Sequence, residues 1–217
     1  MAITLSTGAT VSVAKTYANA INITAITNAS NAVATTASAH SISVGDYVEI
    51  SSGWGLLDKR VVRAATGTTG SNLVLEGVDT TDTTKYPVGT GTGSVRRITV
   101  WSQLSQIKDV QASGGSQNFA DVTTISDVVQ RQVPTTRAAV TMTMNVFDDP
   151  TLAWYADVTA ADTARTPYGL LMGFPNGSKL VANAYWSLMK VPTMANNAAL
   201  ESQISLSYAA EPIRYSS

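Results

Sequence analysis

Val140-Thr-Met-Thr-Met-Asn-Val146 is the stretch that decides the fold, because apolar and polar side chains alternate along its whole length. A period of two residues is typical of a β-strand that buries one face and exposes the other. Residues 180–188 and 200–208 show the same alternation, for example at Leu180, Ala182 and Ala184. Because antiparallel sheets commonly pack one face on a core and leave the other in water, these segments predict a half-buried antiparallel sheet.

Next to the first of these strands, residues 150–164 predict one helix. Asp148 or Asp149 is expected to cap it, and Pro150 suits the first helical position because its missing N–H would have no partner there. Its apolar stripe would consist of Leu152, Tyr155 and Val158. A second, weaker helical turn is expected at residues 126–130.

The first half of the chain has a different sequence pattern. Between residues 40 and 98, short β-branched runs alternate with Gly-rich turns, which predicts a small inserted β-barrel-like domain. Residues 1–39 are rich in Thr, Ala, Asn and Ser and predict an extended N-terminal arm or first strand. An ordinary edge strand or a poorly ordered terminus fits the same composition.

The expected fold class is therefore mainly β: an antiparallel β-sandwich or barrel core with one flanking α-helix, plus the inserted small barrel. The expected units are an arm or first strand at 1–39, the insert at 40–98 and the core at 99–217 with its helix.

Composition restricts the chemistry. Only 13% of residues are charged, about half the usual share, so repulsion between copies is weak and association is favoured. A secreted β-domain with a Ser/Thr-rich surface fits equally well. Zero cysteines exclude disulfides, zinc–thiolate sites and cysteine nucleophiles, and a net charge of −1 provides no basic footprint for tight nucleic-acid binding.

The residues that could carry catalysis are few. His40 is the single histidine, and the adjacent Asp148 and Asp149 would point in different directions on a regular element. Gly89-Thr-Gly-Thr-Gly93 lacks the Lys-Ser/Thr ending of a phosphate loop and predicts a turn. We expect no enzyme activity, no metal and no cofactor. We also expect neither a signal peptide nor a membrane anchor, because no basic start precedes an apolar core and no run reaches about 18 apolar residues.

Several runs in the second half of the chain resemble the tail tube proteins of long-tailed, siphophage-type bacteriophages. Phe119-Ala-Asp-Val-Thr-Thr-Ile-Ser-Asp127 followed by Arg131-Gln-Val-Pro-Thr135 is similar to that family's "f-D-v-T-t-l-D … R-q-i-P-T" block. Asp148-Asp-Pro-Thr-Leu-Ala-Trp154 resembles its "D-D-p-s … W" block, and Phe174-Pro-Asn-Gly-Ser178 resembles its "lP-x-G" turn. The resemblance covers about Trp101 to Tyr215.

The resemblance implies a structural virion protein. Such subunits form stacked hexameric rings that build the tail tube, and DNA passes transiently and without specific binding through the lumen during ejection. Assembly would occur in the bacterial host cytoplasm, with the chain itself and with tape measure, terminator and distal tail proteins as partners.

The same resemblance suggests the assembly residues. The expected subunit-interface residues are Phe119, Asp121, Arg131, Pro134, Arg137, Asp148, Asp149 and Trp154. Arg131 or Arg137 would pair with Asp148 or Asp149 of the same or an adjacent subunit. The expected ring-stacking residues of the N-terminal arm are Ile21, Ile23, Ile26 and Asn31.

Three alternatives remain at this point. The chain could be a tail terminator, another tail component or the tube of a contractile or secretion machine. It could be a carbohydrate-binding adhesin module, which would need an exposed aromatic patch such as Tyr47, Trp54 and Tyr86. It could also be a hydrolase whose site the sequence does not reveal.

Overall fold

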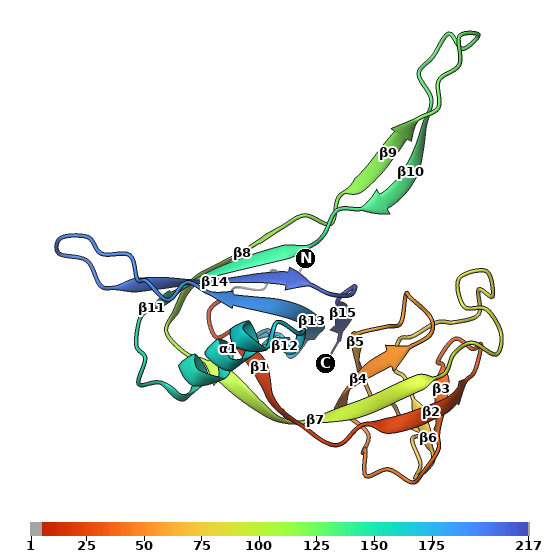
Figure 1. Cartoon of the computed structure of the whole chain (residues 1–217), viewed down its shortest axis with the longest axis horizontal. Coiled ribbons are helices and arrows are strands. Elements are labelled where there is room, and N and C mark those ends of the chain that lie inside the picture. The colour runs from red at the N-terminus through yellow and green to blue at the C-terminus, as the bar shows by residue number, and fades with distance from the viewer. Residues whose placement is uncertain (1–5, 217) are drawn as a thin grey trace.

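The computed structural model describes residues 6–216, and residues 1–5 of the predicted N-terminal arm lie outside them. The chain forms two β-lobes and a projecting hairpin (Figure 1). The elements are β1 (Thr10–Tyr17), β2 (Ile21–Ile26), β3 (Val33–Thr36), β4 (Tyr47–Ser52), β5 (Arg60–Arg63), β6 (Asn72–Val74), β7 (Gly93–Leu104), β8 (Ile107–Ser113), β9 (Gln117–Asp121), β10 (Gln132–Arg137), β11 (Thr141–Phe147), α1 (Ala153–Ala164), β12 (Tyr168–Gly173), β13 (Lys179–Leu188), β14 (Glu201–Tyr208) and β15 (Ile213–Tyr215).

The first lobe, which we call the core sheet, contains the three segments with alternating side chains. Its strands run in the order β7-β1-β12-β13-β14-β11-β8, and every pair of neighbouring strands is antiparallel. One face is apolar and packs on α1 through Met144, Ile204 and Trp186. The predicted fold class is confirmed: a mainly β, antiparallel architecture with one flanking helix and an additional small barrel.

Helix α1 begins later than the sequence predicts. Its N-cap is Leu152, which makes no side-chain capping hydrogen bond. The Asp149 carboxylate instead accepts hydrogen bonds from the backbone N–H of Thr151 at 3.0 Å and from its hydroxyl at 2.6 Å, so it stabilises a turn ahead of the helix. The predicted capping role and the start at Pro150 are therefore wrong. The buried positions of α1 are Trp154, Val158 and Ala161.

The second lobe, the barrel lobe, comprises β2 to β6 and the first half of β7. Its strands follow the order β6-β3-β2-β7-β4-β5, and a bridge between Ala64 and Leu75 closes the circle. Ile23 and Ile26 of β2 are buried in its core. The predicted domain boundary at residue 40 thus falls inside the barrel lobe, because β2 and β3 supply two of its strands.

The two lobes are joined by continuous structure rather than by a linker. Strand β7 runs from one lobe into the other, and the Tyr215 hydroxyl accepts a hydrogen bond from the Arg63 backbone N–H at 2.8 Å. Burial raises the pKa of Tyr215 to about 12. Because β15 pairs with β13 of the core sheet while Tyr215 contacts β5, the last described strand ties the barrel lobe to the core sheet.

A partly buried ion pair lies at the same junction. Glu49 accepts hydrogen bonds from Arg96, both at 3.0 Å, and the Arg96 guanidinium lies over the Tyr17 ring at 4.0 Å. Burial raises the pKa of Glu49, and the charge of Arg96 opposes that rise. Arg97 pairs with Asp46 at 3.1 Å. Arg96 and Arg97, which are consecutive in the sequence, thus both have carboxylate partners within the chain.

Candidate assembly surface

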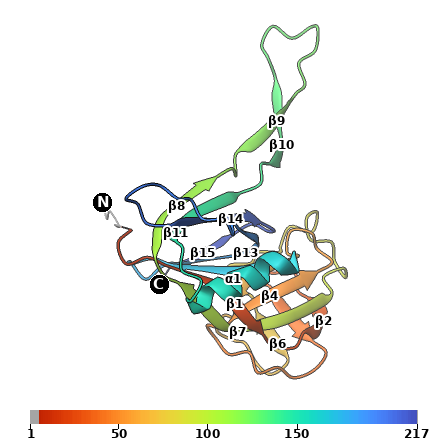
Figure 2. The same cartoon turned by 60° about the vertical axis from the view of Figure 1, so that its left-hand side comes forward.

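The hairpin formed by β9 and β10, residues 114–139, projects far from both lobes (Figures 1 and 2). Every side chain of β10 is exposed, and β9 is nearly as open. An isolated two-stranded hairpin is marginally stable in water, because it buries little apolar surface. A partner that covered it would therefore stabilise it.

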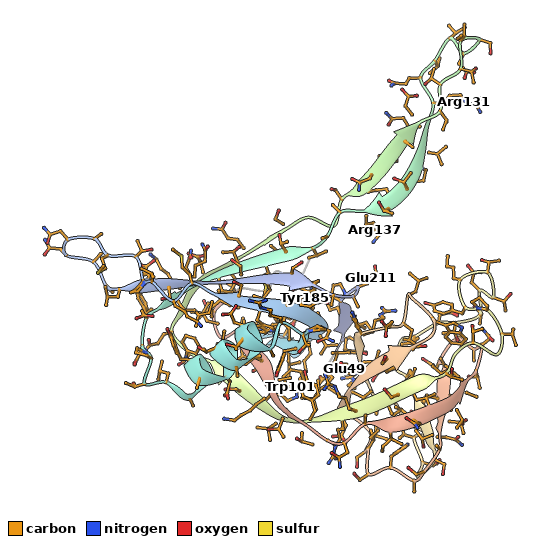
Figure 3. All side chains as sticks on the ribbon, viewed as in Figure 1. Glu49, Trp101, Arg131, Arg137, Tyr185 and Glu211 are labelled. Atoms are coloured by element: carbon orange, nitrogen blue, oxygen red, sulfur yellow. The ribbon has the colours of Figure 1, made fainter. Side chains whose placement is uncertain are left out.

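Five of the eight predicted interface residues lie on this hairpin. Phe119 faces Pro134 across the two strands, Asp121 faces Gln132, and Arg137 faces Gln117. Figure 3 shows Arg131 toward the far end of the hairpin and Arg137 at its root. The phenyl ring of Phe119 is 57% exposed, so it contributes to a surface and not to the core.

Hydrogen bonds to two carboxylates shape the hairpin tip, residues 122–131. Asp121 accepts hydrogen bonds from the Thr123 hydroxyl, from the Gln130 amide at 2.9 Å and from the Thr123 backbone N–H at 2.8 Å. These bonds, the hydroxyl bond first, lower the pKa of Asp121 to about 2. Asp127 accepts from the Thr124 backbone N–H at 2.9 Å, which also lowers its pKa. The helical turn predicted at 126–130 is wrong, because these bonds form turns there instead.

The arginines of the hairpin have partners other than those predicted. Arg131 lies 3.7 Å from Asp127, and Arg137 lies 3.4 Å from Glu211. Within the chain, Asp148 instead accepts from the Ser202 hydroxyl at 2.7 Å. The predicted pairing inside one subunit is therefore wrong, because the hairpin carries both arginines away from the helix. Pairing with an adjacent subunit stays a prediction.

The other predicted residues lie elsewhere. Trp154 is only 2% exposed, and its indole N–H donates to the Ser105 hydroxyl at 3.2 Å. In the proposed arm, Ile23 and Ile26 point into the barrel lobe, whereas Asn31 is exposed on its surface and Ile21 is half-buried. In this conformation, only the last two have a side chain that a neighbouring ring could reach. The stacking role itself stays a prediction.

A groove of about 1040 Å³ lies between the hairpin root and the barrel lobe. The hairpin contributes residues 134–140, the turn between β14 and β15 contributes residues 208–212, and the barrel lobe contributes Leu56 and Lys85. Much of the lining is small and apolar: Ala138, Ala139, Ala209, Ala210 and Pro212. The sequence does not reveal this groove, because its three walls are far apart along the chain.

Along β11, β14 and the end of β13, the face of the core sheet that points away from α1 is polar. On β12 and the start of β13, the same face is apolar and packs toward the barrel lobe through Leu171 and Val181. Cross-strand pairing places Thr141 beside Ser207, Thr143 beside Ser205, and Asn145 beside Gln203. Tyr185, labelled in Figure 3, and Ser187 continue this face on β13. Its central exposed side chains are uncharged, and the charged Asp109 and Glu201 lie toward one end. Beyond this face, β8 ends the sheet, and no strand within residues 6–216 pairs with its outer edge.

The connection between β13 and β14 also exposes apolar side chains. Met189, Val191 and Met194 are 53%, 68% and 74% exposed. Neither these residues nor Ile125, Val128 and Val129 of the hairpin tip are among the expected subunit-interface or ring-stacking residues. One sequence pattern does indicate them: these apolar residues lie among turn-forming Asp, Thr, Ser and Asn, in segments with neither the period of a strand nor that of a helix.

The aromatic patch that an adhesin would need is not on the surface. Tyr47, Trp54 and Tyr86 are all buried, and the rings of Trp54 and Tyr86 pack edge to face at 5.2 Å. The Trp54 indole N–H donates to the Pro87 carbonyl at 2.9 Å. These side chains hold the barrel lobe together and present no flat aromatic surface to a sugar.

Within residues 6–216, no group of three or more His, Cys, Asp or Glu side chains is placed to hold a metal ion. None of the helices in the same range has the length and apolar character needed to cross a bilayer.

Comparison with known proteins identifies a family. The family model described as "Phage tail tube protein, TTP" matches residues 52–217. Among solved structures, the tube terminating cap of the anti-feeding prophage shares 19% identity with a TM-score of 0.39, covering 54% of this chain and 83% of that chain. No curated protein sequence matches the chain.

Proposed function

We propose that this chain, which belongs to the phage tail tube protein family, polymerises as stacked hexameric rings that form the conduit for DNA in a phage tail. The observation that carries the proposal is the projecting hairpin. Its strand β10 has no buried side chain, and its tip exposes apolar groups that no other part of the described chain covers. Such a segment is stabilised when another subunit covers it.

The free edge of β8 supports the same proposal. An edge strand has a row of unpaired backbone N–H and C=O groups that can pair with another chain. In a ring, β8 would extend the core sheet of one subunit toward the next. The exposed 189–198 segment would then be available to adjacent rings or to other tail proteins such as the tape measure, terminator and distal tail proteins.

The polar face of the core sheet is our candidate for the lumen wall. The Ser, Thr, Asn and Gln side chains at its centre offer hydrogen bonds but no cation to hold a phosphate. Lys108, at one end, is paired with Glu201 at 2.7 Å. DNA would therefore pass without being retained. The face opposite is covered by α1, so only this face of the sheet is open to a channel.

Electron microscopy of the purified full-length chain at high concentration tests the main proposal. We expect hollow rods or stacked rings, because other copies of the same chain can cover both the hairpin and the β8 edge. Single rings that never stack would favour the terminator alternative. A chain that stays monomeric at every concentration would contradict polymerisation.

The lumen assignment has its own test. Ser205→Lys places a cation at the centre of the polar face, and the change repeats in every subunit of the tube. We expect normal tube assembly and slower DNA ejection from virions, with the delay shrinking as salt rises, because salt screens contacts with phosphates. Ser205→Asp is the matched control and should not slow ejection. Equal ejection rates for Ser205→Lys and the unmodified chain would contradict the assignment of this face to the lumen wall.

A further inference from the structure

We propose that the hairpin tip of one copy of this chain docks in the groove between the hairpin root and the barrel lobe of a second copy. This inference rests on the proposed function, because it names the contact through which subunits of the tube would join. It pairs two surfaces that nothing in the described part of the same chain covers: an apolar projection and a groove with small side chains.

The tip supplies the apolar projection. Ile125 and Val128 are fully exposed, and Val129 is 74% exposed. The Asp121 and Asp127 hydrogen bonds described above already shape the loop that carries them. A loop shaped before binding loses little conformational freedom when it docks, which favours association.

The groove is a suitable receptor for branched aliphatic side chains. Its walls come from three separate segments, and the alanines at 138, 139, 209 and 210 leave room that larger side chains would fill. Val140 and Leu56 add apolar surface at its margins. The volume of about 1040 Å³ is enough for the apolar side chains of the tip together with part of their backbone.

The charges of the two surfaces are opposite. The tip and its first strand residue carry two carboxylates, Asp121 and Asp127, against the single guanidinium of Arg131. The groove is lined by two cations, Lys85 and Arg137, against the single carboxylate of Glu211. Both cations already have a carboxylate partner in their own chain, Asp82 for Lys85 at 3.0 Å and Glu211 for Arg137 at 3.4 Å. Because Lys85 and Arg137 are both more than 60% exposed, the carboxylates of a docking tip can compete with these partners. Complementary charge sets the orientation of such a contact.

The occupant must be a second copy. The hairpin is extended, and Figures 1 and 3 show its tip pointing away from its own root. Val128 and Ala139 are eleven residues apart on one extended arm, so their separation is about 30 Å. A contact between two unlike surfaces of the same molecule is heterologous, and contacts of that type generate rings or helical stacks. Docking in one direction therefore agrees with a tube, whereas a reciprocal exchange of tips would close a two-fold dimer and give a single dimer band in place of a ladder.

Disulfide trapping tests the contact directly, because the chain has 0 cysteines of its own. The full-length double variant Val128→Cys/Ala139→Cys is concentrated, oxidised and run on a non-reducing denaturing gel. A disulfide requires Cα atoms within about 7 Å, so the two positions cannot bridge within one molecule. We expect a ladder of covalent oligomers that reducing agent collapses to monomer.

Three controls define the result. Each single-cysteine variant should run as a monomer on the same gel, because the docked arrangement places neither two tips nor two grooves next to each other. The pair Val128→Cys/Val44→Cys places the second thiol at an exposed barrel position outside the groove and should give no ladder. An equal ladder from that control pair would overturn the inference.

Electron microscopy of the same samples separates this inference from the proposed function. Rods without a ladder would overturn the tip-to-groove contact and leave the tube standing. A ladder without rods would support the contact and contradict the tube. Neither rods nor a ladder would overturn both.

Discussion

Replacing residues 117–137 with Asn-Gly should abolish polymerisation and leave a folded monomer. The flanking residues already pair, since Ala138 N–H donates to the Ser116 carbonyl at 2.9 Å, and Asn-Gly suits a two-residue hairpin loop. The ion pair from Arg137 to Glu211, at 3.4 Å and exposed on both sides, ties the removed hairpin to the rest of the chain. An exposed pair contributes about 0–1 kcal/mol, so the free energy of unfolding should change little.

The measurement combines chemical denaturation with electron microscopy of concentrated protein. A second variant, in which only residues 123–130 are replaced by Asn-Gly, keeps the two strands and removes the apolar tip. We expect it to fold and to fail in assembly as well, because the tip carries the apolar contact. Normal tubes from the longer deletion would show that the hairpin is dispensable and would remove the main support for the proposed function.

Trp154→Ala should destabilise the isolated subunit strongly. The indole is 2% exposed between α1 and the core sheet, and its N–H is bonded to Ser105. Truncating a buried Trp to Ala typically costs about 3–5 kcal/mol through lost burial and the cavity left behind. For a chain of this size each kcal/mol shifts Tm by about 2–4 °C, so Tm should fall by about 6–20 °C.

Thermal unfolding under conditions that keep the chain monomeric checks this prediction. Trp154→Phe keeps much of the volume and loses the hydrogen bond, so its cost should be smaller, about 1–3 kcal/mol. Tyr185→Ala changes a side chain that is 40% exposed on the polar face and should shift Tm much less. An unchanged Tm with lost assembly in Trp154→Ala would place this side chain at a subunit interface, as the sequence resemblance suggests.

The assembly surface was predictable only in part. The run from Phe119 to Arg137 was identifiable by its resemblance to a family block, and the structure places that run on the hairpin. The partner of each arginine was not predictable, because ion pairing depends on which segments fold close together. Asp127 is local to Arg131, whereas Glu211 is 74 residues from Arg137.

Two local expectations also failed, one because a competing local turn formed and the other because a tertiary contact took precedence. Asp149 has the residue type of a helix cap, yet its carboxylate bonds to Thr151 and α1 starts after Leu152. Ile23 and Ile26 lie in a low-complexity segment with no clear period, yet the closed barrel lobe supplies a core that buries both.

What the sequence by itself determined is the half-buried sheet. Alternation along β11, β13 and β14 assigns each side chain to a face, because consecutive residues of a strand point to opposite sides. It also determined that the open face would be polar and nearly uncharged, since those residue types occupy the alternate positions.

Only the tertiary structure decided that β2 and β3 join the barrel lobe, that Trp154 is buried, and that a groove faces the hairpin. Each of these depends on contacts between residues far apart along the chain, such as Arg137 with Glu211 or Arg63 with Tyr215. Periodicity reports which side of an element is buried. It carries no information on which distant segment covers that side, because that choice depends on how whole elements pack in three dimensions.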